Sequence, residues 1–106
     1  MPVERSGRTE DAAMSGRSAT RQILVSHSPG LHARPCLAIV NTVRRFQSKV
    51  ELRNGEREAD AGEILQLMSL GVPQGTEITL RAKGPDAEEA LDALVHLFAD
   101  NFGFSE

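Results

Sequence analysis

The pattern of apolar and polar positions changes sharply near residue 21. Residues 1–20 mix charged residues with Ser, Gly and Thr and show no apolar period, so they cannot bury enough surface to offset the entropy lost on ordering. We therefore predict a flexible N-terminal tail at 1–20 and one folded domain at 21–106. An expression remnant, a docking arm and a plain extension all fit the tail, and we favour the plain extension.

Four short segments are typical of β-strands, because their apolar residues either form a brief continuous run or alternate with polar ones. A strong hairpin signal, Asn54-Gly55, joins the second of these segments to the third. The predicted strands lie at residues 23–25, 49–53, 57–61 and 78–82.

Three further segments place apolar residues at the three-and-four spacing of a helix face. The second of them is stopped by Gly71, a residue that readily adopts a left-handed conformation at a helix end. Asp86 and Glu89 form a capping box at the start of the third. The predicted helices lie at about residues 33–46, 63–70 and 87–101.

The resulting order, β-α-β-β-α-β-α, predicts an α+β fold of the open-faced β-sandwich type. A four-stranded antiparallel sheet is then covered on one face by the three helices. The chain has no Trp or Tyr and only four Phe, so the core must be mainly aliphatic.

Composition excludes several classes of function. The formal net charge of −3 argues against a general nucleic-acid binder, which needs a positive field to displace counterions. No apolar run approaches the ~20 residues that cross a bilayer, and the N-terminus lacks the apolar stretch of a signal peptide. The single cysteine, Cys36, allows no internal disulfide and fits a reducing interior. We therefore expect a cytoplasmic monomer with neither a membrane nor a nucleic-acid partner.

The motif that carries chemistry is Gly30-Leu31-His32-Ala33-Arg34-Pro35, where a loop enters the first predicted helix. His32 lies at the helix start, and the backbone N–H groups of Ala33, Arg34 and Cys36 are expected to lack intrahelical acceptors. A phosphate carried on the imidazole would meet those amides and the positive end of the helix dipole.

The other residues of the motif fit the same chemistry. Pro35 lacks an N–H, which costs little in a first turn, and Gly30 allows the chain to turn tightly. Arg34 adds a permanently charged donor for phosphoryl oxygens. The helix end also disfavours a protonated imidazole, which leaves a neutral, nucleophilic ring. His32 alone would more simply be an ordinary surface residue; the whole hexapeptide at this junction favours phosphoryl chemistry.

This hexapeptide resembles the active-site signature of the HPr family, the histidine-containing phosphocarriers of the bacterial phosphoenolpyruvate phosphotransferase system. With Met68-Ser69-Leu70-Gly71 and the order of elements, the resemblance spans about residues 21–104. Some details are closer to the nitrogen-related branch, NPr, namely Leu52-Arg53-Asn54, residues 84–91, Leu97-Phe98 and residues 101–104.

The resemblance implies a function in a relay rather than as a turnover enzyme, with no cofactor. Enzyme I, phosphorylated from phosphoenolpyruvate, would transfer the group to Nδ1 of His32, which would pass it to an enzyme IIA-type protein in sugar transport or nitrogen regulation. Arg34 falls on the family's phosphate-contacting arginine. The regulatory serine of many family members is replaced here by Glu63, so that kinase switch should be absent. Glu63 could imitate a phosphoserine, although the helix dipole already explains a carboxylate there.

A carrier must present its site to several proteins. We predict that Leu37, Ile64, Leu65 and Met68 form an exposed docking patch around His32; core packing is the alternative for each.

The remaining chemistry-bearing residues are expected to be spectators. His27 lies in the active loop and His96 on the polar side of the last helix. A metal site from His27, His32 and Cys36 lacks a fourth ligand and has Arg34 in the way, so we expect no metal and a packing role for Cys36.

Two other functions remain open from the residues alone. A regulatory protein of the same fold could act by partner binding, although such proteins usually lose the histidine. A ligand-binding module would need converging polar groups, and we see no such set.

Overall fold

The computed structural model describes residues 17–26, 30–100 and 102. Their elements follow the predicted order. They are β1 (Arg17–Leu24), α2 (Ala33–Val43), β2 (Lys49–Asn54), β3 (Arg57–Asp60), α3 (Ile64–Ser69), β4 (Glu77–Gly84) and α4 (Ala87–Ala99).

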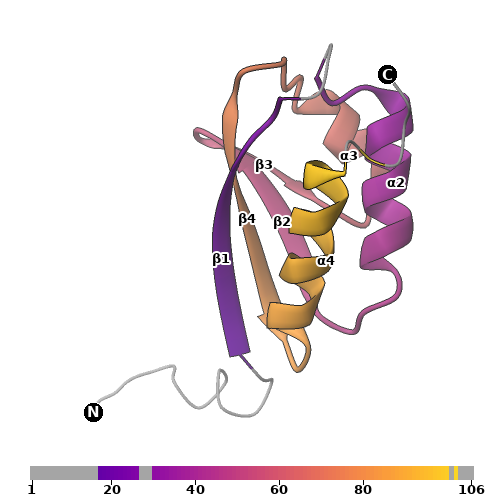
Figure 1. Cartoon of the computed structure of the whole chain (residues 1–106), viewed down its shortest axis with the longest axis vertical. Helices are drawn as coiled ribbons and strands as arrows, with labels where there is room; N and C mark the ends of the chain where they lie inside the picture. Colours follow the sequence, from indigo (N-terminus) through magenta and orange to yellow (C-terminus); the bar gives the residue numbers. More distant parts are fainter. Residues whose placement is uncertain (1–16, 27–29, 101, 103–106) are drawn as a thin grey trace.

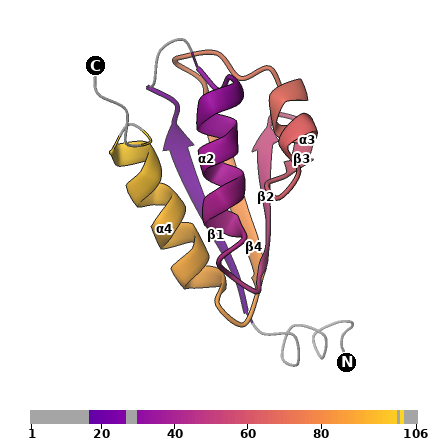
Figure 2. The same cartoon turned by 90° about the vertical axis from the view of Figure 1, so that its right-hand side faces the viewer.

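The four strands form one antiparallel sheet in the order β1-β4-β2-β3, and the three helices lie together on one of its faces (Figures 1 and 2). The predicted α+β open-faced sandwich is confirmed. Inward-facing residues of the strands alternate with outward polar ones, as in Val50 and Leu52 of β2 and Ile78 and Leu80 of β4. The core is aliphatic as predicted: among the described residues, Phe102 is the only aromatic side chain that is fully buried.

Strand β1 begins earlier than its apolar run predicts. It pairs with β4 along its whole length, from Arg17 opposite Gly84 to Leu24 opposite Glu77. Backbone pairing with an equally long partner, rather than the apolar run at 23–25, determines where this strand starts. Residues 17–20 of the predicted tail therefore belong to the sheet, with Ala19 buried; residues 1–16 lie outside the described residues.

The ends of α2 and α4 also differ from prediction. Helix α2 ends at Val43 rather than residue 46, because the following amides of Arg45 and Phe46 bond to carbonyls three residues back. Helix α4 ends at Ala99, close to its predicted end. Gly71 adopts the expected left-handed conformation (φ +61°) after α3.

The capping box predicted at the start of α4 is wrong. Instead of capping the helix, the Asp86 carboxylate accepts hydrogen bonds from the backbone N–H groups of Gln47 (2.9 Å) and Ser48 (2.8 Å) and from the Ser48 hydroxyl (2.5 Å). Ser48 is buried and gives the carboxylate a nearer set of donors than its own helix does. Asp86 thus joins the α2–β2 loop to the start of α4.

The Asn54-Gly55 hairpin is confirmed, with its turn one residue later. Asn54 is the last residue of β2 and pairs with Arg57, so Gly55 (φ +65°) and Glu56 form the turn. Within the described part of the chain, no helix combines the length and apolar character needed to span a bilayer.

Candidate functional site

His32 stands at the amino end of α2, as predicted. It is the N-cap residue, with extended backbone (φ −103°, ψ −166°), and its carbonyl accepts the first helical hydrogen bond from the Cys36 N–H at 3.1 Å. The His32 side chain is exposed. Figure 1 shows this end of α2 at the same end of the molecule as α3 and the connection from α3 to β4.

The prediction that the backbone N–H of Cys36 is available to bind phosphate is wrong. Because His32 is the N-cap, the N–H of Cys36 already bonds within the helix and is not an open donor. Ala33 and Arg34 occupy the first two helical positions, whose amides have no intrahelical acceptor, and Pro35 has no N–H. The first turn contains no acidic residue, and its Arg34 side chain is exposed. An anion at this end would therefore meet the amides of Ala33 and Arg34.

The loop before His32 is held by the segment that follows α3. The Leu31 N–H donates to the Val72 carbonyl at 2.9 Å, and Gly30 pairs with Pro73 in an isolated bridge. Gly30 has φ +124°, and a Cβ there would lie 2.4 Å from the Val72 oxygen. The predicted need for glycine is thus both conformational and steric.

A shallow hollow of about 190 Å³ adjoins His32. The sequence did not indicate that the segment after α3 would form one wall, although Gly71 and Pro73 are typical turn residues and gave a weak signal. The hollow is lined by Gly30, Leu31, His32, Gly71, Val72 and Pro73.

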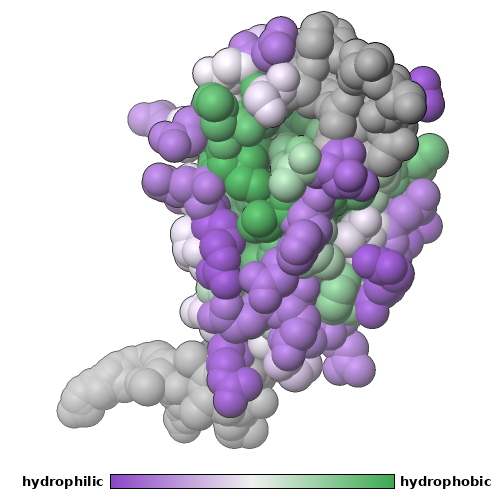
Figure 3. Space-filling model, in the orientation of Figure 1, coloured by the Kyte–Doolittle hydropathy of each residue, from purple (hydrophilic) through white to green (hydrophobic). Residues whose placement is uncertain are grey.

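Three of the four predicted docking residues are exposed. Leu65 exposes 77%, Leu37 51% and Met68 42% of its surface, on the neighbouring helices α2 and α3. Ile64 is half-buried and packs against the core, so core packing accounts for it in part. Figure 3 shows further apolar surface in the upper half of the molecule, over the carboxyl-terminal end of β1, where Leu24 is exposed.

The remaining predicted residues are placed as follows. Glu63 is exposed at the N-cap of α3, where its carbonyl accepts the Leu67 N–H at 3.1 Å. His96 is exposed on α4 with Nδ1 3.0 Å from the Asp92 carbonyl oxygen. His27 lies outside the described residues, among which no three His, Cys, Asp or Glu side chains gather to hold a metal.

Cys36 is buried one turn into α2. Burial raises the pKa of its thiol to about 11, so the reactive thiolate is scarce near neutral pH. This environment agrees with the predicted packing role.

Comparison with known proteins decides the family. Residues 19–100 match the family model PTS-HPr, described as the PTS HPr component phosphorylation site. The chain belongs to the HPr family of phosphocarriers. This confirms the resemblance drawn from residues 30–35.

Individual relatives agree with this assignment. The chain is 39% identical to phosphocarrier protein NPr of Proteus mirabilis over 83 residues, 77% of this chain and 92% of that protein. The crystal structure of HPr-C-His from Thermoanaerobacter tengcongensis superposes with a TM-score of 0.79 at 38% identity, covering 83% of this chain and 99% of that one.

A longer relative contains a matching segment. The PEP-dependent dihydroxyacetone kinase, phosphoryl donor subunit DhaM, of Providencia stuartii is 39% identical over 89 residues, 84% of this chain. The matched part is only 19% of DhaM. This chain therefore matches both a small phosphocarrier protein over most of its length and a short part of a larger phosphoryl donor subunit.

Proposed function

We propose that this HPr-family protein accepts a phosphoryl group on Nδ1 of His32 from enzyme I and passes it to an enzyme IIA-type protein. The observation that carries the proposal is the exposed His32 at a helix amino end whose first turn has no carboxylate. The lone pair of the neutral ring nitrogen attacks phosphorus, and a nitrogen–phosphorus bond forms as the donor's bond to phosphorus breaks. The reverse exchange hands the group to the acceptor.

The groups around His32 suit a temporary hold on an anion. The helix end contributes about 0.3–1 kcal/mol and each charged hydrogen bond, such as one from Arg34, about 1.5–3 kcal/mol. Stabilisation of this size favours the phosphorylated state without trapping it. The protein acts as a relay component rather than as a turnover enzyme.

The exposed side chains of Leu37, Leu65 and Met68 form the docking patch of this proposal. They lie on the two helices beside His32, where a partner approaching the imidazole would cover them. Donor and acceptor would then use the same face in turn. The family relay and the single reduced cysteine support a cytoplasmic location.

Glu63 bears on regulation. An exposed carboxylate at the N-cap of α3 cannot accept a phosphoryl group from a serine kinase. We therefore propose that the kinase switch of other family members is absent here.

The test is incubation with phosphoenolpyruvate and enzyme I, followed by intact mass measurement. We expect an acid-labile gain of one phosphoryl group, which His32→Ala abolishes and the control His96→Ala retains. Retained labelling of His32→Ala would refute the site. Arg34→Ala should still be labelled, about tenfold more slowly, because one charged hydrogen bond is lost.

A further inference from the structure

We infer that Arg57, on the edge strand β3, is a positioning residue that holds α3 and the loop bearing His32 in the arrangement needed for transfer. This inference rests on the proposed function, because it assigns Arg57 a role in presenting the docking patch. Arg57 lies on a different element from every residue of the motif at 30–35.

Helix α3 is too short to be stable by itself. It has six residues, of which only Leu67 is fully buried, and two others are the exposed docking residues Leu65 and Met68. Isolated helices shorter than ~12 residues are marginal in water, because nucleation is costly. Contacts with the rest of the protein must therefore fix the position of α3.

Arg57 contacts the carboxyl end of α3. Its guanidinium donates to the Ser69 carbonyl at 2.6 Å and to the Leu70 carbonyl at 3.4 Å. The last carbonyls of a helix lack intrahelical donors and form the negative end of its dipole. A planar guanidinium satisfies two of them at once and brings a favourable charge.

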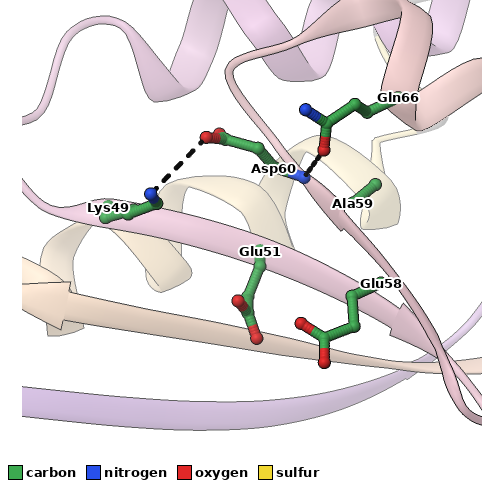
Figure 4. Close-up of a pocket in the computed structure, with 6 residues that line it drawn as sticks. All are labelled: Lys49, Glu51, Glu58, Ala59, Asp60 and Gln66. Atoms are coloured by element: carbon green, nitrogen blue, oxygen red, sulfur yellow. Dashed lines mark hydrogen bonds and ion pairs between the residues drawn. The ribbon is translucent and has the colours of Figure 1, made fainter.

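A second contact from the same strand fixes the middle of α3. The Gln66 side-chain oxygen accepts the backbone N–H of Asp60 at 2.9 Å, at the rim of a hollow of about 270 Å³ over β2 and β3 (Figure 4). The Asp60 carboxylate oxygen Oδ2 also lies 3.9 Å from Nζ of Lys49 on β2. The edge strand thus holds α3 at two points, Gln66 and the carboxyl end.

The segment that follows the carboxyl end of α3 is hydrogen-bonded to the loop that bears His32. Leu70 is followed by Gly71 and Val72, and the Val72 carbonyl accepts the N–H of Leu31, the neighbour of His32. Arg57 therefore acts on His32 through a short run of backbone. Losing it should loosen the docking patch and the hollow beside His32 together.

The experiment compares Arg57→Met with wild-type full-length protein as substrates of phosphorylated enzyme I. We expect KM for the carrier to rise about tenfold with a small change in kcat, as one charged hydrogen bond is lost. Arg57→Lys, which keeps the charge and one donor, should recover part of the loss. The control is Arg21→Met on β1, the opposite edge strand of the sheet, which removes a guanidinium that donates to Glu88 of α4 at 2.6 Å.

Amide hydrogen exchange of the free proteins gives a second readout. Arg57→Met should speed exchange at the α3 amides of Leu67 and Met68 and leave α4 unchanged. A raised KM without faster exchange in α3 would mean that Arg57 contacts the partner directly. Wild-type values of both KM and exchange would leave Arg57 without a role in transfer. Either result overturns the inference. Should α4 loosen as well, the milder Arg57→Gln decides by the same two readouts.

Failure of the proposed function is distinguishable from failure of this inference. If the wild-type protein takes up no phosphoryl group, the phosphocarrier proposal fails before any variant is compared. If wild type is labelled and Arg57→Met matches it in KM and exchange, only the positioning role fails.

Discussion

The amino ends of α2 and α4 present the same backbone chemistry and are treated in opposite ways. Helix α4 starts at Asp86 and carries Glu88 and Glu89 in its first turn, so its own carboxylates face the positive end of its dipole. Helix α2 starts at His32 and has no acidic residue in its first turn, where Arg34 adds a positive charge. The first turn of α4 thus supplies its own negative charge, and the first turn of α2 supplies none.

The side chains at the two starts differ in the same sense. The Asp86 carboxylate is committed to the α2–β2 loop, where the Ser48 hydroxyl and the amides of Gln47 and Ser48 hold its pKa below the usual range. The His32 side chain is exposed beside a shallow hollow. The two N-cap side chains therefore differ in exposure and in the element that each one adjoins.

The largest expected effect comes from making α2 resemble α4. Ala33→Glu places a fixed carboxylate in the first turn of α2. This charge repels an incoming phosphoryl group, so transfer should slow by roughly tenfold or more. The free energy of unfolding should rise by about 0.5 kcal/mol for the same reason. Stopped-flow transfer and denaturant titration measure the two quantities.

Two variants control this comparison. Ala33→Gln, of matching size without the charge, should transfer at close to the wild-type rate. Glu89→Ala in α4 should lose about 0.5 kcal/mol of stability and leave transfer unchanged. Equal rates for Ala33→Glu and Ala33→Gln would show that the anion does not bind at this helix end.

The second prediction concerns Gly30, in the loop that leads into α2. Gly30→Ala forces a Cβ against the Val72 carbonyl at positive φ, and we expect a loss of about 3 kcal/mol in unfolding free energy together with slower transfer. Gly55→Ala has positive φ but no neighbour within 4 Å, so it should cost about 1 kcal/mol and leave transfer intact. Denaturant unfolding of both variants checks the difference, which comes from the close approach of the Val72 carbonyl and from the φ of +124° at Gly30, against +65° at Gly55.

The third prediction separates docking from packing within α3. Leu65→Glu changes a side chain that is 77% exposed and should slow transfer about tenfold at unchanged stability, since a desolvated apolar contact with the partner is lost. Leu67→Glu changes a fully buried neighbour and should unfold the protein. Leu37→Glu on α2 should behave like Leu65→Glu. Loss of folding in the Leu65 or Leu37 variant would identify that leucine as core.

The smallest effect on transfer is expected at the amino end of α4. Because the pKa of Asp86 is lowered in the folded state, its contribution to stability is present above the unfolded pKa and is lost as pH falls through the folded value. Asp86→Asn should therefore be less stable than wild type at pH 7, with the two converging below about pH 4. Transfer rates at neutral pH should match. A stability difference that grows on acidification would contradict this assignment.

The fold and the centre of the site could be predicted from the sequence, because both depend on local signals. Period and turn chemistry located each strand and helix, and the hexapeptide at 30–35 placed His32 at a helix start. Contacts between distant segments could not be predicted. The Asp86–Ser48 hydrogen bonds, the pairing of β1 beyond its apolar run and the contact of Arg57 with α3 all depend on tertiary neighbours. The amide of Cys36 was misjudged because its availability depends on which residue is the N-cap.

The buried thiol of Cys36 has a practical consequence. It lies in the first turn of α2, and burial raises its pKa to about 11, so an alkylating reagent should modify it only when this region opens. The rate of its modification would then report how often the helix opens next to His32. The native cysteine thus allows the opening rate of this helix to be measured without an added label.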